Sequence, residues 1–222
     1  MKIGIMQPYF FPYIGYFQLI HCVDTYVNLD HVSFMKRSYM TRNVLKNNTP
    51  INVNVWGASQ NKKCNEIYVN FENNYISNFL KKLENLYSKE SNYDIILNDI
   101  ILPEFINREV TISELNLNLI KRICNYLDIQ TKIINTSNGF TTLKKEKGLK
   151  SIIKQIGSNV YINAIGGQSL YNKEDFKNDN IELNFIKMGN VDFDNKNSST
   201  LDLLFRYDKS HIQKQIVNYK LI

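Results

Sequence analysis

Cysteine, histidine, proline and glycine are all scarce in this sequence of 222 residues, which holds 3, 3, 4 and 9 of them, respectively. Cys22, Cys64 and Cys124 stand far apart and form no Cys-x-x-Cys pair. That pattern excludes a disulfide-stapled scaffold and a cysteine zinc site, and it is typical of a protein from the reducing cytoplasm. No spacing of His, Asp or Glu suggests a metal site either.

Arginine is scarce too, and this limits what the positive charge implies. Lysine and arginine total 27 against 21 acidic residues, a formal net charge of +6, but only five of the 27 are arginine. Base and phosphate recognition in nucleic acids relies on arginine forks, and no Arg-rich run or aromatic RNA-binding motif is present. We therefore expect no nucleic-acid partner. The mild positive field suits small anions such as nucleotides.

One long uncharged run, residues 3–23, needs a separate test because its 21 residues could span a bilayer by length alone. Pro8 and Pro12 interrupt the run together with Gly4 and Gly15, and a membrane helix tolerates such breaks poorly. No small-residue cleavage site follows. We expect no membrane span, and a soluble, cytoplasmic protein.

Apolar runs of strand length alternate with helical patterns at both ends of the chain. Strands are expected at 2–6, 25–29, 129–134, 160–164 and 181–186, and helices at 14–20, 143–156 and 174–177. Such alternation predicts an α/β fold of the Rossmann-like kind with a mostly parallel sheet. The length favours a single domain over residues 1–222.

The middle of the chain has a different pattern. Residues 51–55 alternate as a strand does, and 65–71 are a second candidate strand. Helices are expected at 76–88 and 94–105. A third begins after Thr111, because Glu114 three residues later completes a capping box. We predict a helical insertion at about residues 75–127.

Open parallel sheets bind their ligands beyond the carboxyl ends of the strands. Three loops are expected at that edge, residues 7–16, 135–139 and 165–169. Glycines and hydroxyl side chains in such loops let backbone N–H groups approach a phosphate. Gly166 and Gly167 are suited to this role, and a plain turn is the alternative.

The first of these loops carries the most distinctive motif. Residues 7–17, Gln-Pro-Tyr-Phe-Phe-Pro-Tyr-Ile-Gly-Tyr-Phe, hold six aromatic side chains, which we expect on a loop rather than in a core-facing stripe. The motif resembles the QPxYFPYxGYF-type opening of the WbqC-like family. This resemblance covers nearly the whole chain and extends to Asp30, Lys36, Arg42-Asn43, Tyr161, Gly166-Gly167, Tyr171 and Phe176. It implies work on amino sugars in bacterial O-antigen and polysaccharide synthesis, such as attachment of a glycyl or other acyl group.

A second, weaker resemblance concerns mechanism. The strand, the proline-bearing loop and the helix start are similar to the HxGH arrangement of the nucleotidylyltransferase superfamily, with Tyr13 and Tyr16 where those enzymes carry histidines. Residues 197–201, Asn-Ser-Ser-Thr-Leu, resemble their phosphate loop at a helix N-terminus, which implies use of ATP with magnesium. Tyrosine has a pKa near 10 and does not stabilise phosphate charge as an imidazole does. A helix N-cap is the alternative role for residues 198–200.

Four side chains at the expected ligand edge are the candidates for chemistry and sugar recognition. Gln7 follows a buried strand and is placed to orient a substrate. Tyr13 and Tyr16 would shape a sugar pocket, unless they cap the core with a solvated hydroxyl. Asp30 ends a strand, where a carboxylate can accept the proton of an amine nucleophile, and a turn cap is the alternative.

Basic residues further along are candidates for the diphosphate. Lys36 and Arg42 lie close in sequence, and Arg42 can bind a phosphate through two hydrogen bonds. A solvated charge run explains these two residues equally well. The remaining substrate-binding candidates are Asn43, Gly166, Gly167, Tyr171 and Ser198.

The main functional hypothesis is an enzyme that N-acylates a nucleotide-linked amino sugar, by glycyl or aminoacyl transfer from a donor that the sequence does not identify. One alternative is ATP-dependent nucleotidyl or adenylyl transfer. The other is non-catalytic binding of a nucleotide sugar.

Overall fold

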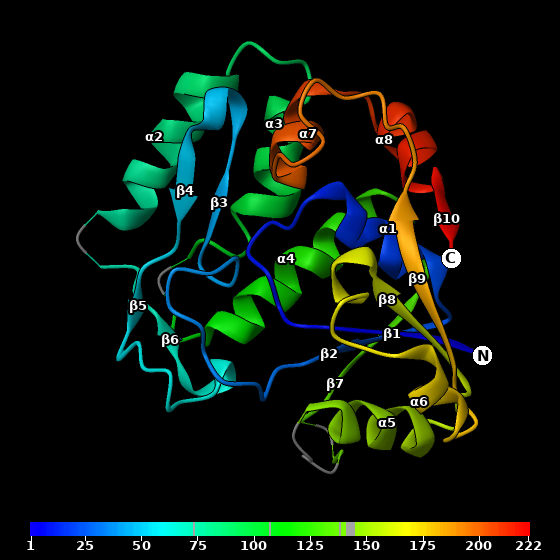
Figure 1. The fold of residues 1–222 in the computed structure, drawn as a ribbon. Coiled ribbons are helices and arrows are strands. Elements are labelled where there is room, and N and C mark those ends of the chain that lie inside the picture. The colour runs from blue at the N-terminus through cyan, green and yellow to red at the C-terminus, as the bar shows by residue number, and fades with distance from the viewer. Residues whose placement is uncertain (73, 107, 138, 141–144) are drawn as a thin grey trace.

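Five parallel strands and one antiparallel edge strand form the central sheet of the computed structural model, which describes residues 1–72, 74–106, 108–137, 139–140 and 145–222 (Figure 1). The strands lie in the order β10-β9-β8-β1-β2-β7. Their bounds are β1 Lys2–Met6, β2 Thr25–Asn28, β7 Lys132–Asn135, β8 Val160–Ala164, β9 Glu182–Met188 and β10 Tyr219–Leu221. The predicted Rossmann-like α/β fold with a mostly parallel sheet is confirmed.

The strand order places a topological switch point between β1 and β8. From β1 the chain adds β2 and β7 on one side, whereas β8 and β9 lie on the other. The parallel register pairs Gly4 with Ile162, so the loops that follow β1 and β8 leave the sheet at the same level. Open α/β sheets bind ligands in the crevice that forms at such a point.

Helices cover both faces of the sheet. One hydrophobic cluster contains residues of α1 (Ile14–Cys22), α4 (Ile112–Tyr126), α7 (Thr200–Arg206) and α8 (Lys209–Ile216), and a second contains residues of α5 (Lys145–Gln155) and α6 (Lys173–Lys177). Successive residues of β1 point to opposite faces of the sheet, since Ile5 belongs to the second cluster and Met6 packs against the first. Figure 1 shows α5 and α6 together, away from α4 and α7. None of the described helices has the length and apolar character needed to cross a membrane.

The middle of the chain holds two short antiparallel pairs and the predicted helical segment. Strands β3 (Arg42–Val44) and β4 (Pro50–Asn52) form one pair, and β5 (Val55–Trp56) and β6 (Tyr68–Val69) the other. The single strand predicted at 51–55 is therefore wrong. The chain changes partners there, because Val53 N donates to Thr41 O whereas Asn54 O accepts from Asn70 N.

Helices α2 (Tyr75–Tyr87) and α3 (Tyr93–Ile96), a π-helical turn at Leu97–Ile101 and α4 occupy the predicted insertion. The capping box of α4 is confirmed: Thr111 Oγ1 accepts from Glu114 N at 3.2 Å, and Glu114 Oε2 accepts from Thr111 N at 2.9 Å. Helix α8, strand β10 and the β3–β4 pair were not predicted from the sequence. Residues 143–144 of the helix expected at 143–156 lie outside the described residues.

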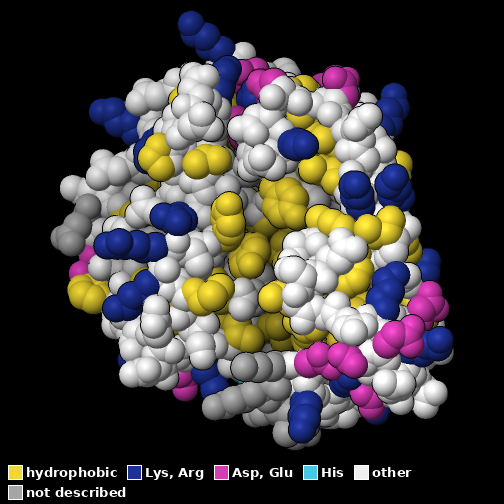
Figure 2. Space-filling model, in the orientation of Figure 1, with side chains coloured by type: hydrophobic (Ala, Val, Ile, Leu, Met, Phe, Trp, Pro, Cys, Tyr) yellow, Lys and Arg dark blue, Asp and Glu magenta, His cyan; other side chains and the backbone are white. Residues whose placement is uncertain are grey.

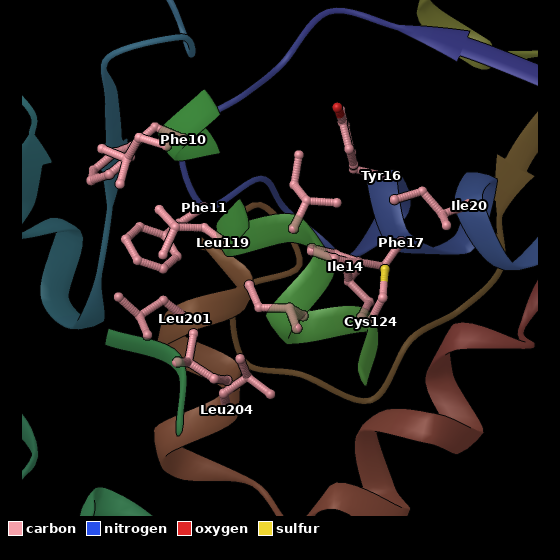
Figure 3. Packing of buried hydrophobic residues seen from close by; sticks show 14 of the residues in the cluster. Phe10, Phe11, Ile14, Tyr16, Phe17, Ile20, Leu119, Cys124, Leu201 and Leu204 are labelled. Carbon is pink, nitrogen blue, oxygen red and sulfur yellow. The ribbon is translucent and has the colours of Figure 1, made fainter. Parts of the chain in front are cut away.

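Aromatic residues of the 7–17 motif contribute to the core. Phe10, Phe11 and Phe17 are fully buried, and Figure 3 shows Phe11 near Leu119 of α4 and Phe17 near Cys124 of the same helix. The expectation that the motif stands apart from the core is wrong for these side chains. Phe11 adopts a left-handed backbone conformation, with φ of 43°, which turns consecutive phenylalanine rings into the core.

Candidate functional site

A cavity of about 790 Å³ opens beyond the carboxyl ends of β1, β8 and β9, at the switch point of the sheet. Figure 2 shows a hollow with apolar side chains near the middle of this face. The volume lies in the range of small-molecule sites. Six of the predicted site residues line it, namely Gln7, Tyr13, Asn43, Gly166, Gly167 and Tyr171.

The aromatic loop after β1 forms one wall of the cavity. Side chains from other segments hold this loop by donating hydrogen bonds to its backbone carbonyls. Asn43 Nδ2 donates to Phe10 O at 3.1 Å and to Phe11 O at 2.7 Å, and Ser199 Oγ donates to Phe11 O at 2.8 Å. Asn116 Nδ2 donates to Pro8 O at 3.1 Å. Buried side chains of three separate segments thus satisfy the loop, so its shape is set before a ligand arrives.

Tyr13 lies over Gly15 at the start of α1. A Cβ built on Gly15 would stand 2.4 Å from Tyr13 Cε2 and 2.9 Å from Cζ, so only glycine leaves room for the ring in this position. Burial raises the pKa of Tyr13 and of the neighbouring Tyr9. Both hydroxyls therefore stay protonated at neutral pH and can donate as well as accept hydrogen bonds.

Tyr16 is buried beneath the cavity rather than in its wall. Its hydroxyl donates to Gln7 O at 2.8 Å and shares a short hydrogen bond with the Tyr26 hydroxyl. Burial raises the pKa of both phenols. Tyr16 thereby fixes the backbone of Gln7, whose side chain lines the cavity.

The Gly166-Gly167 turn forms the opposite wall, directly after β8. A Cβ on Gly167 would stand 2.2 Å from Asn163 Nδ2, whereas one on Gly166 would meet nothing within 4 Å. Asn163 Oδ1 accepts from Ala164 N at 2.8 Å, which fixes this amide under the turn. Asn163 also lines the cavity and is a polar residue near the end of an otherwise apolar strand.

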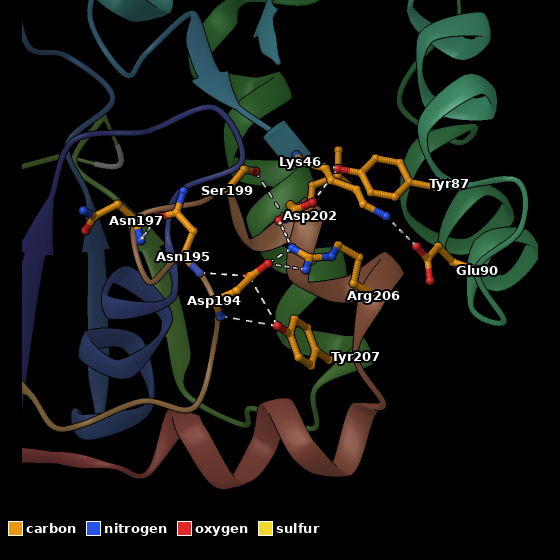
Figure 4. Close-up of polar contacts among 11 residues, drawn as sticks. Lys46, Tyr87, Glu90, Asp194, Asn195, Asn197, Ser199, Asp202, Arg206 and Tyr207 are labelled. Carbon is orange, nitrogen blue, oxygen red and sulfur yellow. Dashed lines mark hydrogen bonds and ion pairs between the residues drawn. The ribbon is translucent and has the colours of Figure 1, made fainter. Parts of the chain in front are cut away.

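Asn197 completes the wall from the C-terminal third of the chain and is held by a polar network (Figure 4). Its backbone N donates to Asn195 Oδ1 at 3.0 Å, and Asn195 N donates to Asp194 Oδ1 at 2.9 Å. Arg206 binds Asp194 through two hydrogen bonds and also pairs with the fully buried Asp202. The guanidinium lowers the pKa of the Asp194 carboxyl.

Asp30 does not line the cavity. Its buried carboxylate accepts hydrogen bonds from Thr136 Oγ1 at 2.7 Å, from Ser137 N at 2.8 Å and from the Ser137 hydroxyl. These contacts join the ends of β2 and β7. The structure thus places Asp30 as the cap of the loop at 135–139, of which Asn138 lies outside the described residues.

Lys36, Arg42 and Ser198 also lie away from the lining. Lys36 and Arg42 are exposed, whereas Ser198 is buried and its backbone N donates to Asn195 O. The N-cap expected in residues 198–200 is confirmed at Ser199, whose Oγ accepts from Leu201 N at 3.2 Å at the start of α7.

The lining contains no Asp, Glu, Lys, Arg, His or Cys among the residues that the structure describes. Its polar side chains are instead five carboxamides and five phenols. Those that were not among the candidate site residues named from the sequence are Gln18, Asn163, Asn197, Tyr9, Tyr39 and Tyr161. Gln18 Nε2 donates to Gln215 O and Asn218 O, while its buried Oε1 has no partner in the described structure. The described residues also hold no cluster of three or more His, Cys, Asp or Glu suited to a metal.

Fold and site together define a Rossmann-like α/β protein with an uncharged, ligand-sized cavity at the switch point of its sheet. The sequence profile of the WbqC-like protein family matches residues 7–214, and the chain belongs to this family. It is 26% identical over 181 residues to Uncharacterized protein Rv1507c of Mycobacterium tuberculosis (strain ATCC 25618 / H37Rv), an alignment that covers 79% of this chain and 77% of that protein. No solved structure matches the chain.

Proposed function

We propose that this protein binds a nucleotide-linked amino sugar in the switch-point cavity and transfers an acyl group, glycyl or aminoacyl, to its amino group during synthesis of a bacterial surface polysaccharide. Membership of the WbqC-like family supports the polysaccharide context. The position of the cavity supports a nucleotide, because doubly wound sheets bind nucleotides at this crevice.

The observation that carries the proposal is the neutral polar lining. Sugar hydroxyl and amino groups require many hydrogen-bond donors and acceptors, but they do not require a charged partner. Gln7, Tyr13 and Asn197 present carboxamide and phenol groups to one cavity, on a loop that buried contacts hold in place. Such a site rejects substrates that leave its polar groups unpaired, which is the strongest source of specificity between similar ligands.

The reaction would form an amide bond between the sugar nitrogen and the acyl carbon, while the bond from that carbon to its leaving group breaks. The lining offers no carboxylate or imidazole among the described residues, so the amine proton would depart with the leaving group. The Tyr13 hydroxyl, which burial keeps protonated, would donate to the oxyanion that develops on the acyl group. Acceleration would then come mainly from positioning the two substrates.

A non-catalytic nucleotide-sugar binder is the second candidate. It is favoured by the absence of a carboxylate or imidazole from the described lining, because acyl transferases commonly use a general base of this kind. The two candidates predict the same binding but differ in turnover.

Thermal shift and calorimetry with UDP, dTDP and their amino-sugar conjugates test the proposal. A ligand present at 100 times its Kd adds about 2.7 kcal/mol to the stability of the ligand-free protein. At equal concentrations we expect an amino-sugar nucleotide to stabilise the protein more than the bare diphosphate does. Incubation with activated acyl donors should then add the mass of the acyl group to the sugar. The matched control is the same nucleotide sugar with a hydroxyl in place of the amine, which should bind but gain no mass as an amide.

Binding without acylation by any donor would assign the protein to the binder class. If the diphosphate and its amino-sugar conjugate stabilise the protein equally, the sugar makes no contact with the site. That result would contradict both the acyl transferase and the nucleotide-sugar binder. ATP belongs in the same screen, since stabilisation by ATP alone would favour adenylyl transfer.

A further inference from the structure

The cavity has two unlike ends. The end beneath α5 is lined by residues of the second hydrophobic cluster, namely Ile5, Leu29, Leu149, Tyr161 and Tyr171. The other end is lined by the aromatic loop and by carboxamides from distant segments, as described above. The Gly166-Gly167 turn belongs to the same lining and follows the strand that carries Tyr161.

Tyr161 is the unusual residue of the apolar end. Its side chain is 1% exposed and its ring stacks on Phe176, with centroids 5.8 Å apart and planes at 24°. Its hydroxyl has no hydrogen-bond partner among the described residues, although Tyr161 lines the cavity. A buried phenol is normally paired, so an unpaired one at a cavity wall indicates that a ligand or water supplies the partner.

Tyr171 packs against the same phenylalanine but is only half-buried. Its ring meets Phe176 edge to face, with centroids 5.7 Å apart, and its hydroxyl also lacks a partner in the described structure. Burial raises the pKa of Tyr161 and Tyr171, so both hydroxyls are neutral and can donate or accept. Two hydroxyls and two aromatic rings thus stand among aliphatic side chains at one end of the cavity.

We propose that this end binds the nucleobase, with the hydroxyls of Tyr161 and Tyr171 as its hydrogen-bonding partners, and that the sugar lies at the end formed by Gln7, Tyr13 and Asn197. This inference rests on the proposed function. A planar heterocycle has an apolar face for Leu29 and Leu149 and a polar edge for the two hydroxyls. An acyl chain would leave both hydroxyls unpaired, and a sugar would leave most of its own hydroxyls unpaired against aliphatic carbon.

The test is the affinity of Tyr161→Phe for UDP and dTDP, and for their amino-sugar conjugates, measured by calorimetry. Removal of one hydrogen bond should weaken a nucleoside diphosphate and its conjugate by the same factor, about five- to tenfold. The unfolding midpoint without ligand should not fall, because the lost hydroxyl has no partner in the described protein. Tyr171→Phe gives a second reading at the same end.

Two contrasting variants make the result specific. Gln7→Ala, at the other end, should reduce the extra affinity of the conjugate over the diphosphate. Tyr75→Phe, on α2 and absent from the lining, should change no affinity.

The outcomes separate this inference from the proposed function. If Tyr161→Phe weakens diphosphate binding but conjugates bind no better than diphosphates, the base subsite stands and the proposed function falls. If conjugates bind the wild type better than diphosphates do, but Tyr161→Phe changes the affinity for neither ligand, the nucleobase subsite is contradicted and the proposed function stands. If no nucleotide binds the wild type, both are overturned.

Discussion

At the scale of single residues, Gly15 determines where the Tyr13 ring lies on the cavity wall. Both belong to the motif that follows β1, and the ring occupies the space that any Cβ on residue 15 would need. Glycine in a helix is less favourable than alanine by about 1 kcal/mol. The space that the Tyr13 ring needs explains why glycine is present in the first turn of α1.

Gly15→Ala should weaken ligand binding while leaving stability nearly unchanged, because the gain in helix propensity offsets the displaced ring. The measurement is a double-mutant cycle with Tyr13→Ala, read by calorimetry. If Gly15→Ala acts through the ring, it should add no further loss in the Tyr13→Ala background. Additive losses would show that Gly15 acts on the cavity by another route.

The three cysteines are free and buried, and their protonation makes a second prediction at this scale. Burial raises the pKa of Cys64 and of Cys124 to about 12, so at pH 8 only about one thiol in 10⁴ is a thiolate. In the native protein at pH 8 we expect neither residue to react with Ellman's reagent. Three equivalents should react in denaturant, and prompt labelling of two thiols in the native state would contradict the burial.

At the scale of elements, Asp30 joins the ends of two neighbouring parallel strands. Its carboxylate accepts one backbone and two hydroxyl hydrogen bonds from the segment that follows β7. A hydrogen bond to a charged group contributes about 1.5–3 kcal/mol to the free energy of unfolding, which is more than a hydrogen bond between neutral groups contributes. The position of Asp30 at the end of a strand also predicts a proton acceptor, so the two roles need an experiment that separates them.

Asp30→Asn should lower the free energy of unfolding by about 1.5–3 kcal/mol if the residue caps this loop. Ser137→Ala, which removes one of the donors, is the matched variant, and the double variant should lose less than the sum of the two. Chemical denaturation gives the stability. A variant with normal stability and nucleotide affinity but greatly reduced turnover would support the proton acceptor instead.

At the scale of the whole molecule, one polar network ties the helical insertion to the C-terminal helices and to the cavity wall (Figure 4). Tyr87 of α2 donates to Asp202 of α7 at 2.6 Å and accepts from Lys46 N at 3.1 Å. Arg206 links the same Asp202 to Asp194, near Asn197. Burial and the neighbouring carboxylate raise the pKa of Tyr87, which keeps this donor protonated.

Tyr87→Phe should therefore cost roughly 1.5–3 kcal/mol of unfolding free energy, because it leaves the buried Asp202 carboxylate without one donor. Tyr75→Phe is the control on the same helix, since the Tyr75 hydroxyl donates only to the neutral Asn52 O at 2.7 Å. That change should cost about 1 kcal/mol or less. Equal losses in urea denaturation would contradict a special role for the network.

Much of the fold could be predicted from the sequence because the relevant signals are local. The strands at 2–6 and 160–164 have the predicted bounds, and the Thr111–Glu114 capping box marks the start of α4. These features depend on neighbours within a few positions. The strand expected at 51–55 failed because it changes partners between Val53 and Asn54, which no local alternation reveals.

The candidate site could be predicted only in part. The loops after β1 and β8 were expected at the ligand edge, and Gln7, Tyr13 and Gly166 do line the cavity. Tyr161 was not proposed as a site residue, because an aromatic residue within an apolar strand is indistinguishable in sequence from ordinary core. Lys36 was proposed from its charge, and charge does not tell on which side of a loop a residue lies.

By itself the sequence determined the five parallel strands, the helices between them and the class of fold, and it indicated the edge of the sheet where a ligand would bind, since these follow from apolar periodicity, capping and chain connectivity. Only the tertiary structure decided which aromatic side chains fill the core and which face the cavity. Ser199 Oγ holds Phe11 O across 188 positions, and Asp30 meets Ser137 across 107. Contacts at such separations depend on the packing of the whole chain, because local conformational preference acts only between near neighbours.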